Sequence, residues 1–139
     1  MKDWDIKTIL LGYDGSEGAD QAARLASAVA RHNNARILVV TAFHEVSHDV
    51  MGTRTSSDIA EARDTAQEMV LKLQTAGIEA GPDVLEGEAS EALLRAAETH
   101  GADLIVVGRR GHGRGVELLI GSTSEDVVRR ATVPVLVAH

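Results

Sequence analysis

The sequence predicts a single-domain α/β protein, with five strands in a mainly parallel sheet and helices on both faces. Three observations favour this class. Apolar runs of strand length alternate with longer segments in which apolar residues recur at helical spacing. The runs show little polar alternation, which is typical of strands buried on both faces. The length of 139 residues suits one domain, which we place at residues 1–139.

The first strand is expected at residues 7–13, a near-continuous apolar run that ends at the turn sequence Asp14-Gly15-Ser16. Ser16 is a suitable N-cap because its hydroxyl can accept a first-turn N–H. The helix that follows is expected to run to about residue 32, where Asn33 and Asn34 close it. Its apolar positions keep helical spacing at Ala22, Leu25, Ala26 and Val29.

The second strand is expected at residues 35–43, and a long helix with one apolar face at residues 58–76. Gly77 then ends that helix. Residues 78–85 form a weaker strand, which we place at a sheet edge because Pro82 cannot donate to a neighbouring strand.

The remaining elements follow the same alternation of helix and strand. The next helix ends before Gly101, and the last helix opens at Ser122 with the capping-box spacing Ser122-x-x-Glu125. In order, the elements are a helix at 91–100, a strand at 102–108, the helix from Ser122 and a strand at 133–137.

Composition excludes several classes of function. A formal net charge of −7 and three aromatic residues disfavour a general nucleic-acid surface or a base-stacking platform. Cysteine is absent, which removes disulfides and thiolate chemistry. No apolar stretch reaches the roughly 18 residues of a membrane span, and the N-terminus does not resemble a signal peptide. We therefore expect a cytoplasmic protein.

One segment reverses the acidic background. Residues 108–124 contain five glycines and three arginines, and residues 108–115 contain no acidic side chain. The segment lies between the carboxyl end of a buried strand and the start of a helix. That rim is where open parallel sheets bind ligands, and a helix N-terminus offers unpaired N–H groups to an anion. The pattern predicts a phosphate site.

Two common phosphate motifs do not fit the segment. A P-loop requires a lysine, and none lies between Gly108 and Thr123. The dinucleotide fingerprint requires a third glycine where Val116 stands, and it would be expected after the first strand.

The spacing that fits is G-x2-G-x9-G-[ST], formed by Gly108, Gly111, Gly121 and Ser122. With ILLGYDGSEGA at the first strand, ADLIVVGRRGHG at the fourth and LIGSTSEDVVRRATVPVLV near the end, the chain resembles the universal stress protein family. It is most similar to the ATP-binding branch, and the resemblance covers nearly the whole sequence.

The resemblance implies a doubly wound, adenine nucleotide alpha hydrolase-like sheet in strand order 3-2-1-4-5, and often a homodimer through the last strand. It also implies which residues meet the nucleotide. Asp14 would contact the nucleoside, with Thr41 and Ala42 at the adenine wall. Gly12 and Tyr13, where the family commonly has other small or polar residues, would form the adenine mouth. Those implied at the ribose and phosphates are Gly108, Arg109, Arg110, Gly111, Gly121, Ser122, Thr123 and Ser124.

These expectations lead to a stress-response regulatory protein that holds ATP, together with Mg2+ or Mn2+. The motif offers no evident general base and no lysine to stabilise leaving phosphate, so we expect slow ATP hydrolysis at most. The alternative is a dimeric interaction module of the same fold that joins through residues 133–137 and binds no nucleotide.

Three alternative interpretations of individual residues and motifs stay open. Asp14 also fits a turn residue that orders the start of the first helix. Arg109 and Arg114 fit either a phosphate contact or a solvated surface position. The segment HEVSH at residues 44–48 matches a zinc-hydrolase pattern, but that chemistry needs both histidines on one helix, and Gly52 leaves little room for one.

Overall fold

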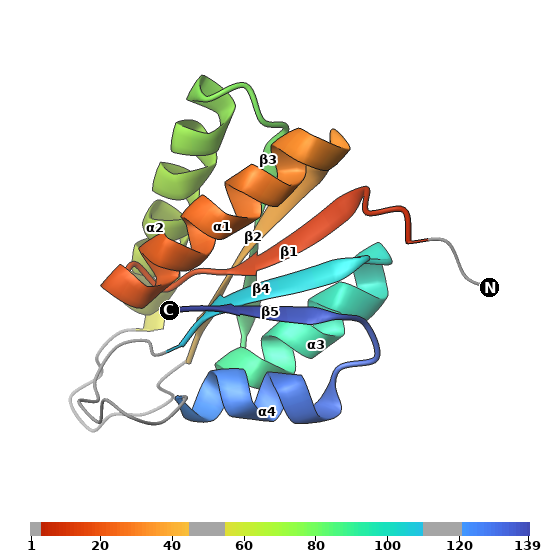
Figure 1. The fold of residues 1–139 in the computed structure, drawn as a ribbon. Helices are drawn as coiled ribbons and strands as arrows, with labels where there is room; N and C mark the ends of the chain where they lie inside the picture. Colours follow the sequence, from red (N-terminus) through yellow and green to blue (C-terminus); the bar gives the residue numbers. More distant parts are fainter. Residues whose placement is uncertain (1–3, 45–54, 110–120) are drawn as a thin grey trace.

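The computed structural model describes residues 4–44, 55–109 and 121–139. Within these residues, five parallel strands form one sheet in the order β3-β2-β1-β4-β5, as predicted (Figure 1). The strands are β1 Thr8–Gly12, β2 Arg36–Phe43, β3 Ala80–Glu86, β4 Leu104–Gly108 and β5 Val135–Ala138.

Helices cover both faces of this sheet. In Figure 1, α1 and α2 lie on one face, and α3 and α4 lie on the other. Their bounds are α1 Glu17–Asn33, α2 Thr55–Thr75, α3 Ala89–His100 and α4 Ser122–Arg130. None of the helices in the described ranges is long and apolar enough to cross a membrane.

The core consists of two apolar layers separated by the sheet. Ile9 and Leu11 of β1 belong to the layer under α1 and α2, whereas Leu10 belongs to the layer under α3 and α4. All three side chains are fully buried. This alternation explains why the central strands are apolar throughout: each successive side chain enters one of the two cores.

The helix ends agree with most of the predicted signals. The Ser16 hydroxyl accepts a hydrogen bond from the Ala19 N–H at 3.2 Å and so caps α1. Asn34 closes the same helix in the left-handed region, with φ 55°. Gly77 and Gly101 follow α2 and α3 with φ of 86° and 61°, a backbone conformation that favours glycine.

Several predicted boundaries were wrong by a few residues. Helix α2 begins at Thr55 and α3 at Ala89, each earlier than expected. The N-cap of α4 is Gly121, not Ser122, and no side chain caps that helix. The predicted capping box with Glu125 is therefore absent, because Ser122 already lies in the first turn.

The edge position of β3 is confirmed. Pro82 pairs in register with Val39 of β2, and β3 has no second neighbour among the described strands. An edge strand tolerates proline because no further strand on its open side needs the missing N–H as a donor.

The sheet has its switch point between β1 and β4. β1 pairs with β2 on one side and with β4 on the other, and Leu11 lies opposite Val106. From β1 the chain continues into α1 on one face, whereas α4, which follows β4, lies on the other (Figure 1). The carboxyl ends at Gly12 and Gly108 therefore lie beside each other, where ligands bind in sheets of this kind.

Candidate functional site

The turn after β1 begins the candidate site at this rim. Asp14 is exposed, and its carboxylate oxygen Oδ1 accepts a hydrogen bond from the Ser16 N–H at 3.0 Å. The Asp14 carboxylate thus orders the turn that leads to the N-cap of α1, as the structural alternative predicted. Its exposure also leaves the side chain accessible at the carboxyl end of the central strand.

Tyr13 fixes the rim from inside the protein. Its N–H donates to the Val40 carbonyl at 2.9 Å, and its carbonyl accepts a hydrogen bond from the Thr41 hydroxyl at 2.9 Å. Its phenol donates to the Asp20 carboxylate on α1 at 2.6 Å. Burial, and then this hydrogen bond, raise the pKa of Tyr13 well above its ordinary value. Tyr13 therefore connects the end of β1 to β2 through its backbone and to α1 through its neutral phenol.

The positions assigned to the adenine wall differ in what they present. Thr41 is 5% exposed, and its hydroxyl is already used by the Tyr13 carbonyl. Ala42 is only partly buried and is two positions beyond Val40, so it shares the sheet face that carries α3 and α4. Of these two side chains, Ala42 is the one that remains accessible to a base.

Gly12 lies at the end of β1 opposite Val40. A β-carbon there would meet the Leu93 side chain at 3.0 Å and the Val107 side chain at 3.3 Å. Glycine therefore leaves room at the end of β1 for the side chains of Leu93 on α3 and Val107 on β4.

Gly108 is required by a helix as well as by its motif. A β-carbon at Gly108 would lie 2.6 Å from the carbonyl carbon of Gly18 and 3.2 Å from the Ala19 nitrogen. These are backbone atoms in the first turn of α1, so no flexible group can give way. The predicted reason for glycine here was a close approach to phosphate; the structure gives an additional reason, the packing of α1 against β4.

Arg109 joins the two ends of the glycine segment. Its N–H donates to the Ala138 carbonyl at 2.8 Å, and its carbonyl accepts the Gly121 N–H at 2.6 Å and the Ser124 hydroxyl at 3.2 Å. The same hydroxyl lies 3.1 Å from the Gly121 carbonyl. Arg110 and Gly111, also assigned to the site, lie outside the described residues.

Ser124 faces inward. It is 3% exposed, and both of its hydrogen-bond partners are backbone carbonyls at the two ends of the segment. The hydroxyl therefore holds the start of α4 to the end of β4. Its position in the sequence motif gave no indication of this direction.

The first turn of α4 starts without a side-chain cap and borders an open pocket. Gly121 provides no side-chain cap, so the N–H groups at the start of the helix meet no side-chain acceptor from the cap residue. Ser122 and Thr123 line an open pocket of about 270 Å³. The pocket also contains acidic side chains; its other lining residues are Glu88, Ser90, Glu125, Asp126 and Arg129.

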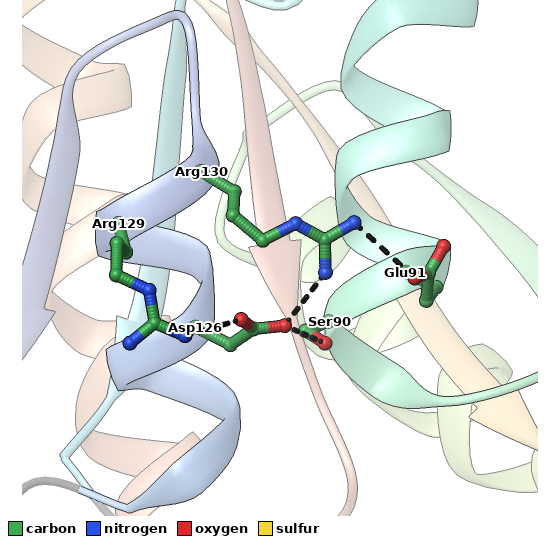
Figure 2. Close-up of polar contacts among 5 residues, drawn as sticks. All are labelled: Ser90, Glu91, Asp126, Arg129 and Arg130. Atoms are coloured by element: carbon green, nitrogen blue, oxygen red, sulfur yellow. Dashed lines mark hydrogen bonds and ion pairs between the residues drawn. The ribbon is translucent and has the colours of Figure 1, made fainter.

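A polar cluster between α3 and α4 was missed by the sequence analysis (Figure 2). Ser90 donates to Asp126 at 2.7 Å, and Arg130 bridges Asp126 and Glu91 at 2.8 and 3.2 Å. Arg129 contacts the second oxygen of Asp126 at 3.1 Å. The Ser90 hydrogen bond is the main cause that holds the pKa of Asp126 below its ordinary value.

The zinc alternative at HEVSH is untested by the structure. His44 is exposed, and the rest of the motif lies outside the described residues. Elsewhere in the described ranges, no group of three histidine, aspartate or glutamate side chains is placed to hold a metal ion.

The sheet order and the switch point define an α/β protein of the adenine nucleotide alpha hydrolase-like class. Residues 5–139 match the model of the universal stress protein family. The chain belongs to this family.

Individual relatives agree with this assignment over nearly the full chain. The "universal stress protein in QAH/OAS sulfhydrylase 3′ region" of Thermus aquaticus is 40% identical, with 96% of this chain and 99% of that protein covered. The solved structure of protein MJ0577, from Methanocaldococcus jannaschii, is 25% identical with a TM-score of 0.85 and 96% of each chain covered. A universal stress protein solved in complex with cAMP is 26% identical, with a TM-score of 0.78 and 97% and 98% covered.

Proposed function

We propose that this protein binds an adenine nucleotide, ATP in particular, at the rim between β1 and β4 and acts as a regulatory protein in stress responses. The observation that carries the proposal is the first turn of α4. It begins at a glycine without a side-chain cap, beside the switch point of the sheet. The N–H groups at the start of a helix and the positive end of its dipole favour a phosphate there.

Two further observations support an adenine nucleotide. The structurally similar protein solved with cAMP contains an adenine nucleotide in the same fold. In this chain, Asp14 lies two residues beyond Gly12 and Ala42 lies two residues beyond its partner Val40. Both are therefore at the carboxyl rim, where Asp14 is exposed and Ala42 is partly exposed. A carboxylate for the ribose hydroxyls and a small wall for the base fit a nucleoside next to the phosphate-binding turn.

The remaining parts of the hypothesis are predictions. The pocket beside α4 contains the carboxylates of Glu88, Glu125 and Asp126, so we propose that the phosphates arrive with Mg2+ or Mn2+, which lowers their charge. The hydroxyls of Ser122, Thr123 and Ser124 are weak bases, and no lysine lies between Gly108 and Thr123 to stabilise leaving phosphate. We propose slow ATP turnover at most, and a homodimer through the edge strand β5.

One observation favours the alternative of an interaction module. The packing of Gly108 against Gly18 explains that glycine without any nucleotide. A chain that had lost nucleotide binding would therefore still need glycine at this position.

The test is a calorimetric titration of Mg-ATP into the wild-type protein and a Gly121→Leu variant. The backbone at Gly121, with φ −63° and ψ 159°, is accessible to any residue, so the substitution introduces no backbone strain. Leucine would place its side chain over the first turn of α4, and we expect affinity to fall at least about tenfold.

The matched control is Gly81→Leu, the same change in the edge strand β3, where a β-carbon meets no atom within 4 Å. The control should bind ATP like the wild type. Equal affinity of all three proteins would overturn the assigned phosphate site. Absence of binding by the wild type would favour the interaction module.

A further inference from the structure

We propose that Ser90 and Asp126 are positioning residues that hold the phosphate-binding end of α4 in place. The inference rests on the proposed function, since it concerns how that same turn is kept ready for an anion. Neither residue belongs to the glycine motif, and they come from different helices (Figure 2).

Helix α4 depends on its neighbours for its position. It has nine residues, of which only Ser124 and Val127 are buried among those described. A helix of this length is not stable alone in water, so its tertiary contacts decide where its first turn lies. The turn can bind phosphate tightly only if its N–H groups are already directed at the ligand.

The contacts of α4 lie on both sides of Val127, which enters the core layer under α3 and α4. On one side, Ser124 is hydrogen-bonded to the Arg109 carbonyl at the end of β4. On the other side, Asp126 and Arg130 face α3, because residues four apart share one side of a helix. Among the described residues, loss of the Asp126 contact would leave the half-exposed pair of Arg130 with Glu91 as the polar attachment of α4 to α3.

Ser90 is the fixed end of this second attachment. It is 4% exposed and lies in the first turn of α3, which is anchored in the core by Leu93 and Ala96. Its hydrogen bond to a carboxylate at 2.7 Å is short and partly buried, and such charge-assisted bonds are among the stronger ones. The ion pair of Arg129 with Asp126 is mostly exposed and adds little.

Removal of the Asp126 charge can test the proposal, because a positioning role and simple electrostatics predict opposite changes in phosphate affinity. Ser90, Asp126 and the phosphate-binding residues Ser122 and Thr123 line the same pocket. Simple electrostatics predicts that removing a carboxylate beside an anion site tightens anion binding. A positioning role predicts the opposite, that phosphate binding weakens when Asp126 is removed.

The experiment measures the affinities of ATP, with and without Mg2+, and of adenosine for the wild type, Ser90→Ala, Asp126→Ala and the double variant; a loss of ATP affinity that needs Mg2+ would indicate a metal contact of Asp126 and overturn the positioning role. We expect ATP affinity to fall about three- to tenfold in each single variant, and the double variant to be no weaker than Asp126→Ala, because the two residues act through one contact. Adenosine affinity should change much less, since adenosine lacks the phosphates that the first turn of α4 is proposed to bind.

The control is Arg95→Ala. Arg95 is also on α3, but its guanidinium donates to the Glu86 carbonyl at 3.0 Å, away from α4. We expect this variant to bind ATP and adenosine like the wild type. Ser90→Ala removes only one hydroxyl, so it remains informative if Asp126→Ala does not fold.

Three further outcomes would overturn the inference. Unchanged or tighter ATP binding by Ser90→Ala and Asp126→Ala would show that the contact does not position the turn. Equal losses for ATP and adenosine would indicate a general structural role. If the wild type bound neither ligand, the proposed function would fail together with the inference, and that result is distinct from the first two.

Discussion

Gly108, the last residue of β4, packs directly on the backbone of Gly18 in the first turn of α1. The contact joins two neighbouring parts of the carboxyl rim. It keeps α1, whose cap follows Asp14, close to the strand that leads into the glycine segment. The shape of the proposed site therefore depends on two glycines that lie far apart in the sequence.

A Gly108→Ala variant should be strongly destabilised. Its new β-carbon would meet the Gly18 carbonyl group, and backbone at a helix start cannot move as a flexible side chain can. We expect the free energy of unfolding to fall by about 2 kcal/mol or more, measured by urea denaturation. Gly81→Ala, in open space on β3, is the matched control and should leave stability within about 0.5 kcal/mol. Similar stability of both variants would contradict the close packing.

The cap of α1 gives a second prediction. Ser16→Ala removes the acceptor of the Ala19 N–H and should lower the free energy of unfolding by about 1 kcal/mol. Ser27→Ala, in the same helix, removes a hydroxyl that bonds the Ala23 carbonyl and should have little effect, because alanine is the better helix former. Thermal and urea unfolding of the two variants give the comparison, and an equal effect of both changes would argue against the cap.

The raised pKa of Tyr13 predicts a change of stability with pH. Its ordinary value is 10.0, and folding favours the protonated phenol. The contribution of Tyr13 to stability is therefore complete below about pH 10 and is lost as the pH rises further. Tyr13→Phe should not show this loss of stability above pH 10, although the variant also loses the hydrogen bond to Asp20 at every pH.

Because Tyr13 is the single tyrosine, the absorbance of tyrosinate reports on this residue alone. We expect the unfolded chain to titrate near pH 10 and the folded protein to remain protonated there. Titration of the native protein at the same pH as the unfolded chain would exclude the buried contact with Asp20.

Ser122 and Ser124 should differ in how much they contribute to stability. Ser124→Ala removes a buried hydroxyl from two carbonyls and should cost about 1 kcal/mol of stability, since the Arg109 carbonyl keeps the Gly121 N–H. Ser122→Ala changes an exposed side chain and should leave stability within about 0.5 kcal/mol. Urea denaturation of both variants tests the difference; the reverse order of stabilities would be inconsistent with the inward direction of Ser124.

The fold was predictable because its signals are local. Near-continuous apolar runs mark strands that are buried on both faces, and β1 shows why: Leu10 and Leu11 enter different core layers. The chemistry of Ser16 likewise predicts a helix cap, and that of Pro82 predicts an edge strand. The resemblance to the universal stress protein family added the strand order.

The site was less predictable because side-chain direction depends on packing. Thr41 and Ser124 occupy positions that suggest ligand contacts, but each hydroxyl is used by a backbone carbonyl within the protein. The contact between Ser90 and Asp126 joins residues 36 positions apart, and it exists only because α3 and α4 pack on the same face. Neither residue carries a local signal of that pairing.

The central claim is that the first-turn N–H groups of α4 hold the phosphates, and amide resonances of Ser122 and Thr123 test it most directly. With the backbone assigned, Mg-ATP should shift both resonances strongly, whereas adenosine should bind more weakly and leave them nearly unchanged. Saturable ATP binding that leaves these two amides unmoved, or an equal response to adenosine, would contradict the claim.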